Sequence, residues 1–359
     1  MRKRQWLRIL PGLAIGVFFA WWLFRGTDWG AVWASLRRVR LGWLVLAEAT
    51  ILGGFLMRIF RWRYIVRAGG DASFRSLFSA TQIGFLANFT LPLRLGEAVR
   101  ALVLTRLTRI PFSQSFAMVA LDRVTDLIGL ICVMLVAIAA FRPEADIVLP
   151  PEIYPHPVSA DLIRTGAMGT AVFLAAVVGV LVLLYINRRL ALRISDACVG
   201  MVSKPLAVRV HKLVDEFADG LHVFRSGSDM AKSIGFSLLT WGSFILTYWT
   251  VMFAFGCAWP WYAPFVTTAV LAVALSIPGA PGFVGQFHFA IAVSATVIMP
   301  DLPLADAKAI AILAHLVNLL PIAAVGVLCL VWEDLGFLEL ARTSAEAQPE
   351  VETPTRDSE

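Results

Sequence analysis

The stretch of sequence that decides the fold is residues 233–300, which read SIGFSLLTWGSFILTYWTVMFAFGCAWPWYAPFVTTAVLAVALSIPGAPGFVGQFHFAIAVSATVIMP. No Asp, Glu, Lys or Arg occurs within it. A helix that crosses a bilayer needs about 20 predominantly apolar residues, so this stretch is long enough for about three crossings. The sequence therefore predicts an integral membrane protein.

The composition of the whole chain supports the same conclusion. Of its 359 residues, 58% are hydrophobic and 16% are charged, whereas soluble domains average about 45–50% and about 25%. These proportions exclude a water-soluble enzyme of this length. The net charge of +6 fits the excess of Lys and Arg that membrane proteins carry in cytoplasmic loops. Because the sequence has no zinc-finger or RNA-recognition pattern, we expect membrane lipids as partners and no nucleic acid.

Hydropathy predicts an all-α, polytopic membrane bundle of about eight spans with broken or re-entrant helices. The predicted spans lie near residues 7–24, 41–64, 116–141, 165–186, 234–255, 263–277, 283–299 and 309–332. The first is interpreted as a retained helix, because no small-residue cleavage site follows it.

The chain divides into a membrane domain, residues 1–335, and an acidic, disordered cytoplasmic tail, residues 336–359. The membrane domain includes an amphipathic, basic segment at 188–232, which we place in the cytoplasm. Counting crossings from there puts both termini in the cytoplasm of a plasma or inner membrane protein. The four cysteines are far apart in the sequence, so we predict neither a disulfide framework nor a metal site, and we expect no cofactor.

The first polar interruption of the apolar pattern is residues 88–100, NFTLPLRLGEAVR. Pro92 removes a backbone donor and Gly96 permits unusual dihedral angles, so a helix should end here, shortly after Asn88. The apolar residues from 77 to 104 then form either a re-entrant hairpin or one broken helix.

This interruption carries the residue types that bind phosphate. If a helix begins near Gly96, its free N–H groups favour an anion, and Arg94 and Arg100 add fork-shaped donors. Glu97, three residues before Arg100, would hold that arginine in place. The alternative is an ordinary cytoplasmic loop with surface arginines.

The second polar group is Asp122, Arg123 and Asp126, near the start of a predicted span. The two aspartates are four residues apart and share one helix face. We predict a partly buried ion network, with Arg58, Arg94 or Arg100 as the basic partner. The alternative is a cap that stays among the lipid headgroups.

The third is residues 278–288, PGAPGFVGQFH. Two prolines and three glycines within eight residues cannot sustain a helix, and in lipid the freed backbone groups must be buried or line a wet cavity. This break contains Pro278, Pro281, Gly282 and Gly285, with Gln286 and His288 as the polar lining.

Two questions about this break stay open in the sequence. Residues 263–299 could form two full crossings or a second hairpin that enters from the opposite face, as in an inverted repeat. His288 is equally well read as a structural donor or as a group whose titration changes activity between about pH 5 and 8. His315 and Asn318 either pack helices together or complete the polar lining.

In these three positions the chain resembles the flippase-like membrane domain family, also known as the transmembrane region of lysylphosphatidylglycerol synthases. The family's P-x-R-x-G-E-x-x-R element is matched by Pro92, Arg94, Gly96, Glu97 and Arg100; its acid-Arg-x-x-Asp element by Asp122, Arg123 and Asp126; and its P-G-x-x-G-x-x-E element by Pro281, Gly282 and Gly285. The Arg61-Trp62 pair also fits. Two positions depart from the family, with His288 and Asp122 in place of glutamates. The resemblance implies translocation or binding of a lipid, without aminoacyl transfer, since the family's synthases carry that chemistry in a soluble C-terminal domain.

The sequence therefore favours a translocase for an anionic or isoprenoid-type lipid. Arg94 and Arg100 would hold the phosphate, with Glu97 and Asp126 orienting them, and residues 278–285 would form the opposing gate. Two alternatives remain: an intramembrane lipid-modifying enzyme with an aspartate as base, and a non-catalytic assembly partner that binds through the amphipathic segment. The catalytic motifs of soluble enzymes are absent.

Overall fold

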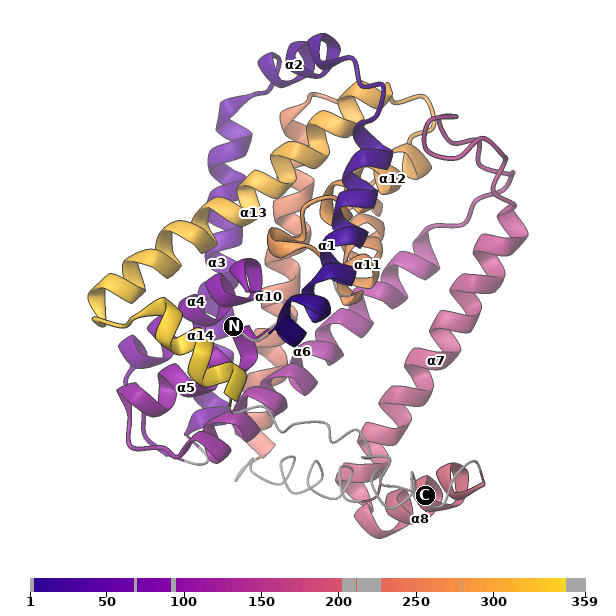
Figure 1. Cartoon of the computed structure of the whole chain (residues 1–359). Coiled ribbons are helices and arrows are strands. Elements are labelled where there is room, and N and C mark those ends of the chain that lie inside the picture. The colour runs from indigo at the N-terminus through magenta and orange to yellow at the C-terminus, as the bar shows by residue number, and fades with distance from the viewer. Residues whose placement is uncertain are drawn as a thin grey trace, which may run out of the picture.

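The computed structural model describes residues 3–67, 70–91, 95–201, 211, 227–277 and 279–346. Within these ranges the fold is all-helical, and β-pairing is limited to one isolated bridge between Ile147 and Val158. The elements are α1 (Lys3–Phe24), α2 (Trp29–Arg37), α3 (Leu41–Val66), α4 (Phe74–Thr90), α5 (Gly96–Leu107), α6 (Phe112–Ala140), α7 (Ala160–Ile186), α8 (Arg188–Gly200), α10 (Gly227–Ala254), α11 (Ala263–Ser276), η2 (Pro281–Phe283), α12 (Gln286–Ile298), α13 (Leu304–Trp332) and α14 (Phe337–Glu346) (Figure 1).

Six described segments are long and apolar enough to cross a membrane, which confirms the predicted polytopic helical fold. They are Leu41–Val66, Phe112–Ala140, Ala160–Val177, Gly227–Ala254, Pro281–Ile298 and Leu304–Trp332. Two shorter apolar helices, Gly12–Phe24 and Ala263–Ser276, bring the total close to the predicted eight.

The centre of the bundle is formed by α3, α6 and α10. Helix α10 packs antiparallel along α3, where Gly54 lies directly against the ring of Phe244 and the Thr50 and Thr247 hydroxyls are 2.9 Å apart. Helix α6 also runs antiparallel to α3. We call the end of the bundle where α3 ends and α6 and α10 begin the first face, and the opposite end the second face.

A re-entrant hairpin, α4–α5, enters and leaves at the first face, between the end of α3 and the start of α6 (Figure 1). Its two helices are in close contact because Gly96 packs against the carbonyl of Gly84, where a side chain would collide. The Asn88 side chain closes the hairpin by accepting the Gly96 N–H at 2.9 Å. Pro92 and Arg94 lie outside the described residues.

A second hairpin, α11–η2–α12, enters and leaves at the second face, where α10 ends and α13 begins. Helix α11 has 14 residues, or about 21 Å at 1.5 Å per residue, too short for a hydrocarbon core of about 30 Å. By length and composition Pro281–Ile298 could cross a membrane, but the short α11 favours a hairpin over two full crossings for residues 263–299.

The break in this second hairpin depends on two glycines with left-handed backbone, Gly282 (φ 69°) and Gly285 (φ 88°). Gly285 also packs against the carbonyl of Gly16 in α1, where no side chain would fit. The tips of the two hairpins meet through the rings of Phe89 and Phe283, whose centroids are 5.5 Å apart. The two broken elements thus approach each other from opposite faces, and Pro278 lies outside the described residues.

Helix α7 stands apart from the other crossing helices in Figure 1. Its buried contact with the bundle is made by Leu174, against Ile131 and Met134 of α6. Helix α8 begins the predicted amphipathic segment, of which residues 202–210 and 212–226 lie outside the described residues.

The structure corrects the predicted boundary of the disordered tail. Residues Phe337–Glu346 form α14, with Leu340 fully buried and Glu339 accepting from Arg106 of α5 at 2.7 Å. The turn before α14 is fixed by Glu333, which accepts from Arg75 and Ser79 of α4 at 2.9 and 2.7 Å. An acidic composition concealed the apolar residues that dock this helix, and residues 347–359 lie outside the described part.

Candidate functional site: a buried arginine and aspartate network

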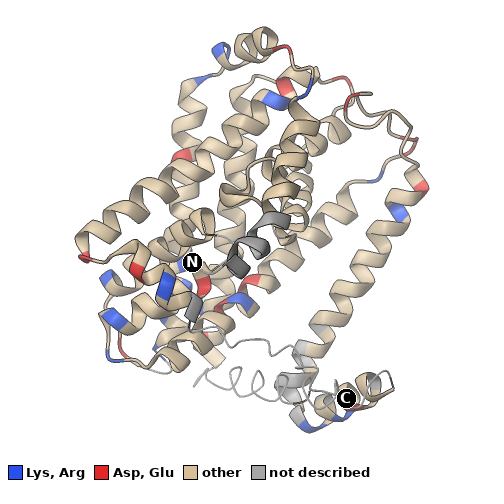
Figure 2. Cartoon of the chain, in the orientation of Figure 1, with Lys and Arg blue, Asp and Glu red and all other residues tan. Residues whose placement is uncertain are grey.

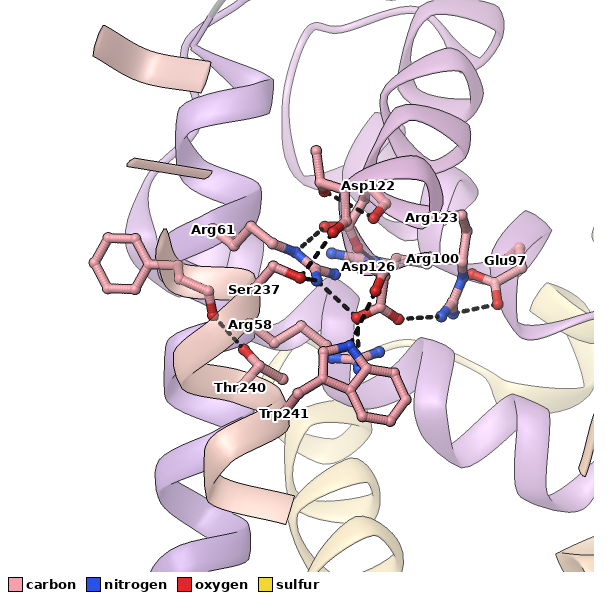
Figure 3. Close-up of polar contacts among 12 residues, drawn as sticks. Arg58, Arg61, Glu97, Arg100, Asp122, Arg123, Asp126, Ser237, Thr240 and Trp241 are labelled. Atoms are coloured by element: carbon pink, nitrogen blue, oxygen red, sulfur yellow. Dashed lines mark hydrogen bonds and ion pairs between the residues drawn. The ribbon is translucent and has the colours of Figure 1, made fainter. Parts of the chain in front are cut away.

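Most of the buried charged residues described in the structure gather where α3, α5 and α6 meet (Figure 2), while buried Lys308 lies apart on α13. Because α3 and α6 run antiparallel, Arg58 and Arg61 on one helix lie opposite Asp126 and Asp122 on the other. Spacings of three and four residues put each pair on one helix face. Arg100 reaches the same point from α5, as Figure 3 shows.

Arg61 is the centre of the network and is fully buried. Its Nε donates to Asp122 Oδ1 at 2.8 Å and its Nη1 to Asp126 Oδ1 at 2.7 Å. Arg100 Nη1 donates to the other oxygen of Asp122 at 2.6 Å, and Arg58 Nη2 reaches Asp126 Oδ1 at 3.3 Å. Asp122 is thus bound by two arginines and Asp126 by at least two, which stabilises both charges in a buried region.

Helix α10 completes the inner wall with polar side chains. Ser237 Oγ accepts from Arg61 Nη1 at 3.3 Å and donates to the Thr125 carbonyl at 2.7 Å. Trp241 Nε1 donates to the Asp126 carbonyl at 3.0 Å. These contacts fix the two aspartates relative to α10 (Figure 3).

The outer edge of the network is formed by Arg123, Glu97 and Asn88. Arg123 pairs with Glu97 and also reaches Asp126 Oδ2 at 3.4 Å, while Asn88 Nδ2 donates to Glu97 at 3.2 Å. The Arg123 and Glu97 side chains are 37% and 29% exposed, whereas those of Arg61 and Asp122 are 0% exposed. We call this edge the rim, because it is where the network opens to the outside.

The described network has more positive charge than its acids neutralise, and some of its donors do not reach an acceptor. Four arginines (58, 61, 100 and 123) face three carboxylates (Glu97, Asp122 and Asp126), which leaves one net positive charge. Among the described residues, four buried guanidinium nitrogens have no hydrogen-bond partner: Arg58 Nε, Arg61 Nη2, Arg100 Nε and Arg100 Nη2. Buried donors are normally satisfied, and leaving one unpaired costs about 1–3 kcal/mol.

Aromatic rings offset part of this cost. The Arg100 guanidinium carbon lies 3.6 Å from the ring centroid of Trp62, and that of Arg58 lies 5.3 Å from Phe85 and 5.6 Å from Phe244. A cation over an aromatic face gains about 2 kcal/mol when desolvated. The Arg61-Trp62 pair therefore contributes an ion-pair centre and a platform for a second arginine.

The sequence profile of the lysylphosphatidylglycerol synthase transmembrane region matches residues 9–326. The chain belongs to this family. The match covers both hairpins and the whole charged network.

The chain is also similar to a curated protein. The glycosyltransferase AglD of Haloferax volcanii is 32% identical to it over 296 residues, which are 77% of this chain and 46% of that protein. The chain therefore spans about half the length of the curated relative it matches.

The structure corrects two ion pairs that were predicted from the sequence. Glu97 was expected to hold Arg100, but it pairs with Arg123, while Arg100 points from α5 to Asp122. Asp126 was expected to orient Arg94 and Arg100, but among the described residues its arginine partners are on α3 and α6. Asp122 is fully buried ten residues into α6, which favours the buried network over the headgroup-cap alternative.

Arg61 is the main residue that the sequence analysis missed as part of the site. It had been noted only as one half of a pair that fits the family. Two arginines three residues apart inside an apolar span, Arg58 and Arg61, are a signal that could have identified it, because charges at that depth face partners.

The polar residues of the second hairpin form a separate cluster. Gln286 Nε2 donates to the Ile277 carbonyl at 3.3 Å, so this side chain ties the two limbs of the hairpin together. His288 and His315 face each other with ring centroids 4.5 Å apart, and Asn318 donates to the Ala314 carbonyl. In the described part of the chain, no group of three or more His, Cys, Asp or Glu side chains is placed to hold a metal ion.

Proposed function

We propose that this protein binds the phosphate group of a membrane lipid at the rim of the network and moves the lipid between leaflets. The observation that carries the proposal is the net positive charge of the buried network, together with its four unpartnered guanidinium nitrogens. Ionisable groups at this depth are costly and usually functional. An anionic or isoprenoid-type lipid supplies a charged headgroup and apolar chains that suit the surrounding helices.

Arginine suits this ligand better than lysine would. Its planar fork of donors matches phosphate oxygens in pairs, and charge-assisted bonds of this kind are about twice as strong as neutral ones. Arg123 is the most exposed arginine of the network, and its partner Glu97 is also partly exposed. A phosphate that replaces Glu97 on Arg123 would reach the network from the rim, with the inner arginines held in place by the two aspartates.

The two hairpins provide the route. Their tips meet at Phe89 and Phe283, between the network and the second face. Broken helices that meet from opposite faces are typical of transporters in which one half moves against the other. Separation of these two rings would open a path for a headgroup from the rim toward the second face.

The distribution of charge supports a cytoplasmic first face. Segment 188–232 connects α7 to α10 there and has eight Lys or Arg and five acids, whereas segment 142–164 at the second face has two arginines and four acids. Short loops rich in Lys and Arg stay in the cytoplasm. We therefore propose a plasma or inner membrane protein with both termini in the cytoplasm.

The test is a fluorescent-lipid translocation assay in proteoliposomes. Arg123→Ala should lower the translocation rate at least tenfold. Arg106→Ala is the matched control, because Arg106 lies on α5 of the first hairpin and pairs with a glutamate, Glu339, away from the network. Equal rates for wild type, Arg123→Ala and Arg106→Ala would refute the assignment of the rim. Arg94→Ala tests the remaining arginine of the first break.

A second candidate function is a role beside a lipid-linked glycosyl transfer. It is supported by the similarity to a protein named as a glycosyltransferase, although the match covers 46% of that protein. This candidate predicts a chemically altered lipid. Mass spectrometry of membrane lipids after deletion and overexpression separates it from translocation, which leaves the lipid unchanged.

A further inference from the structure

Two buried histidines face each other at the break of the second hairpin. His288 on α12 and His315 on α13 are 8% and 4% exposed, and their ring planes meet at 72° with centroids 4.5 Å apart. The rings of Phe24 and Phe287 pack on the pair, at 5.6 Å from His288 and 4.9 Å from His315. The pair belongs neither to the charged network nor to the rim.

Each histidine holds one of the two left-handed glycines of the tip. His315 Nε2 donates to the Gly282 carbonyl at 2.7 Å, since a carbonyl can only accept. The Gly285 N–H donates to His288 Nδ1 at 3.4 Å, so that nitrogen is unprotonated and accepts with its lone pair. Two neutral imidazoles therefore satisfy the contacts seen at the tip, and His288 is the tautomer with its proton on Nε2.

The elements packed around the pair contribute no carboxylate close to it. Helices α11 and α12 and the tip carry no other titratable side chain, and residues 12–24 of α1 carry none. Helix α10 contributes Tyr248, and α13 has Asp306 and Lys308 about two turns before His315. Asp306 is bound to Arg38, and Lys308 donates to Thr27, so neither turns to the histidines.

A proton taken up from solution changes one of these two contacts. When it adds to Nδ1 of His288, the ring becomes an imidazolium and that nitrogen can no longer accept the Gly285 N–H. The new charge also lies in the first turn of α12, whose positive dipole end repels it. When the proton adds to Nδ1 of His315, the Gly282 contact remains. Two charged rings at 4.5 Å would repel each other, so the pair holds one proton at a time; either ring can carry it, and only the proton on His288 breaks a contact of the tip.

The tip that His288 holds is the part of the second hairpin that touches the first. Gly285 packs on the carbonyl of Gly16 in α1, and Phe283, two residues earlier, packs on Phe89. We propose that His288 and His315 form a proton-binding site, and that a proton on His288 Nδ1 releases the tip of the second hairpin from the tip of the first. The proton site is independent of what the protein carries, whereas its use in transport rests on the proposed function.

Two measurements on the full chain in lipid nanodiscs test this without a transport assay. The first is NMR of nitrogen-15-labelled histidine between about pH 8 and about pH 4, a range that includes the usual histidine transition. The second places nitroxide labels at Leu91→Cys and Val284→Cys, one beside each tip, in a chain whose four native cysteines are alanine. Dipolar broadening between the labels reports whether the tips are together.

The expected results distinguish the two histidines. In the wild type, His288 Nδ1 should gain a proton as the pH falls and the broadening should decrease. His288→Gln should abolish the decrease in broadening, because glutamine can accept the Gly285 N–H but does not titrate. His315→Gln should retain the decrease. His156→Gln in the exposed loop serves as control and should also retain the decrease. A His288 that stays unprotonated, a broadening that does not change with pH, or a change that His288→Gln retains would each overturn the proposal.

Discussion

Replacing Asp122 by asparagine is the most direct test of how the buried network is stabilised. The substitution keeps the shape of the side chain but removes the charge that Arg61 and Arg100 share at 2.8 and 2.6 Å, with all three side chains almost fully buried. Removing one partner of a buried ion pair costs about 3–5 kcal/mol, because the remaining charge stays buried without compensation. We therefore expect the free energy of unfolding to fall by about 3–5 kcal/mol.

The assay is equilibrium unfolding in detergent, followed by circular dichroism, with two further variants. Glu339→Gln removes one carboxylate from an ion pair that is 66% exposed on the glutamate side, so it should cost less than about 1 kcal/mol. In Asp122→Asn/Arg100→Met the uncompensated charge on α5 is also removed, and part of the lost stability should return, as a double-mutant cycle would measure. The reasoning is refuted if Asp122→Asn loses no more stability than Glu339→Gln, or if the double variant is no more stable than Asp122→Asn.

Two further predictions concern other parts of the fold. Gly96→Ala should destabilise the protein by about 1–3 kcal/mol in the same unfolding assay, because the added Cβ would collide with the backbone of α4. The control is Gly53→Ala on α3, which should not destabilise the protein because the added Cβ meets open space. Equal stability of the two variants would contradict the close packing of the first hairpin. Burial raises the pKa of Glu333, but the hydrogen bonds from Arg75 and Ser79 and the charge of Arg75 outweigh it, so the pKa of Glu333 lies below its ordinary value. The stability that the Glu333 carboxylate contributes is therefore complete above the ordinary carboxyl pKa and is lost as the pH falls through the lowered pKa. The thermal unfolding temperatures of wild type and Glu333→Gln should differ at neutral pH and converge in acid. A difference that persists in acid would contradict this.

The sequence predicted those features of the fold that depend on local chemistry. The helix breaks near Gly96 and at residues 278–285 follow from proline and glycine, whose effects on the backbone need no tertiary information. The spans follow from apolar length. The same local signal ends α11 after 14 residues, but whether residues 263–299 cross twice or return also depends on how α11 and α12 pack against neighbours far away in the chain, which the sequence does not show.

The pairing of charges was less accessible to sequence reasoning. Arg100 and Arg123 both lie within reach of an acid in their own segment, but the rotation of α5 about its axis sends Arg100 to Asp122 and leaves Glu97 for Arg123. Arg61 lies 61 residues before Asp122, so only the antiparallel packing of α3 and α6 brings them together. Helix α14 was missed for a similar reason, since Leu340 is buried by α5 and not by its own segment.

The excess positive charge of the described network also has an electrical consequence. A unit charge that crosses a membrane potential of 100 mV changes in energy by about 2.3 kcal/mol, and a charge held part of the way across experiences the corresponding fraction. A network with one net charge is therefore sensitive to voltage, whereas the same network neutralised by a singly charged phosphate, the ligand proposed above, is not. In a cell with a negative interior, the potential would draw the unoccupied arginines toward the cytoplasm and would exert no net force on them once they are loaded.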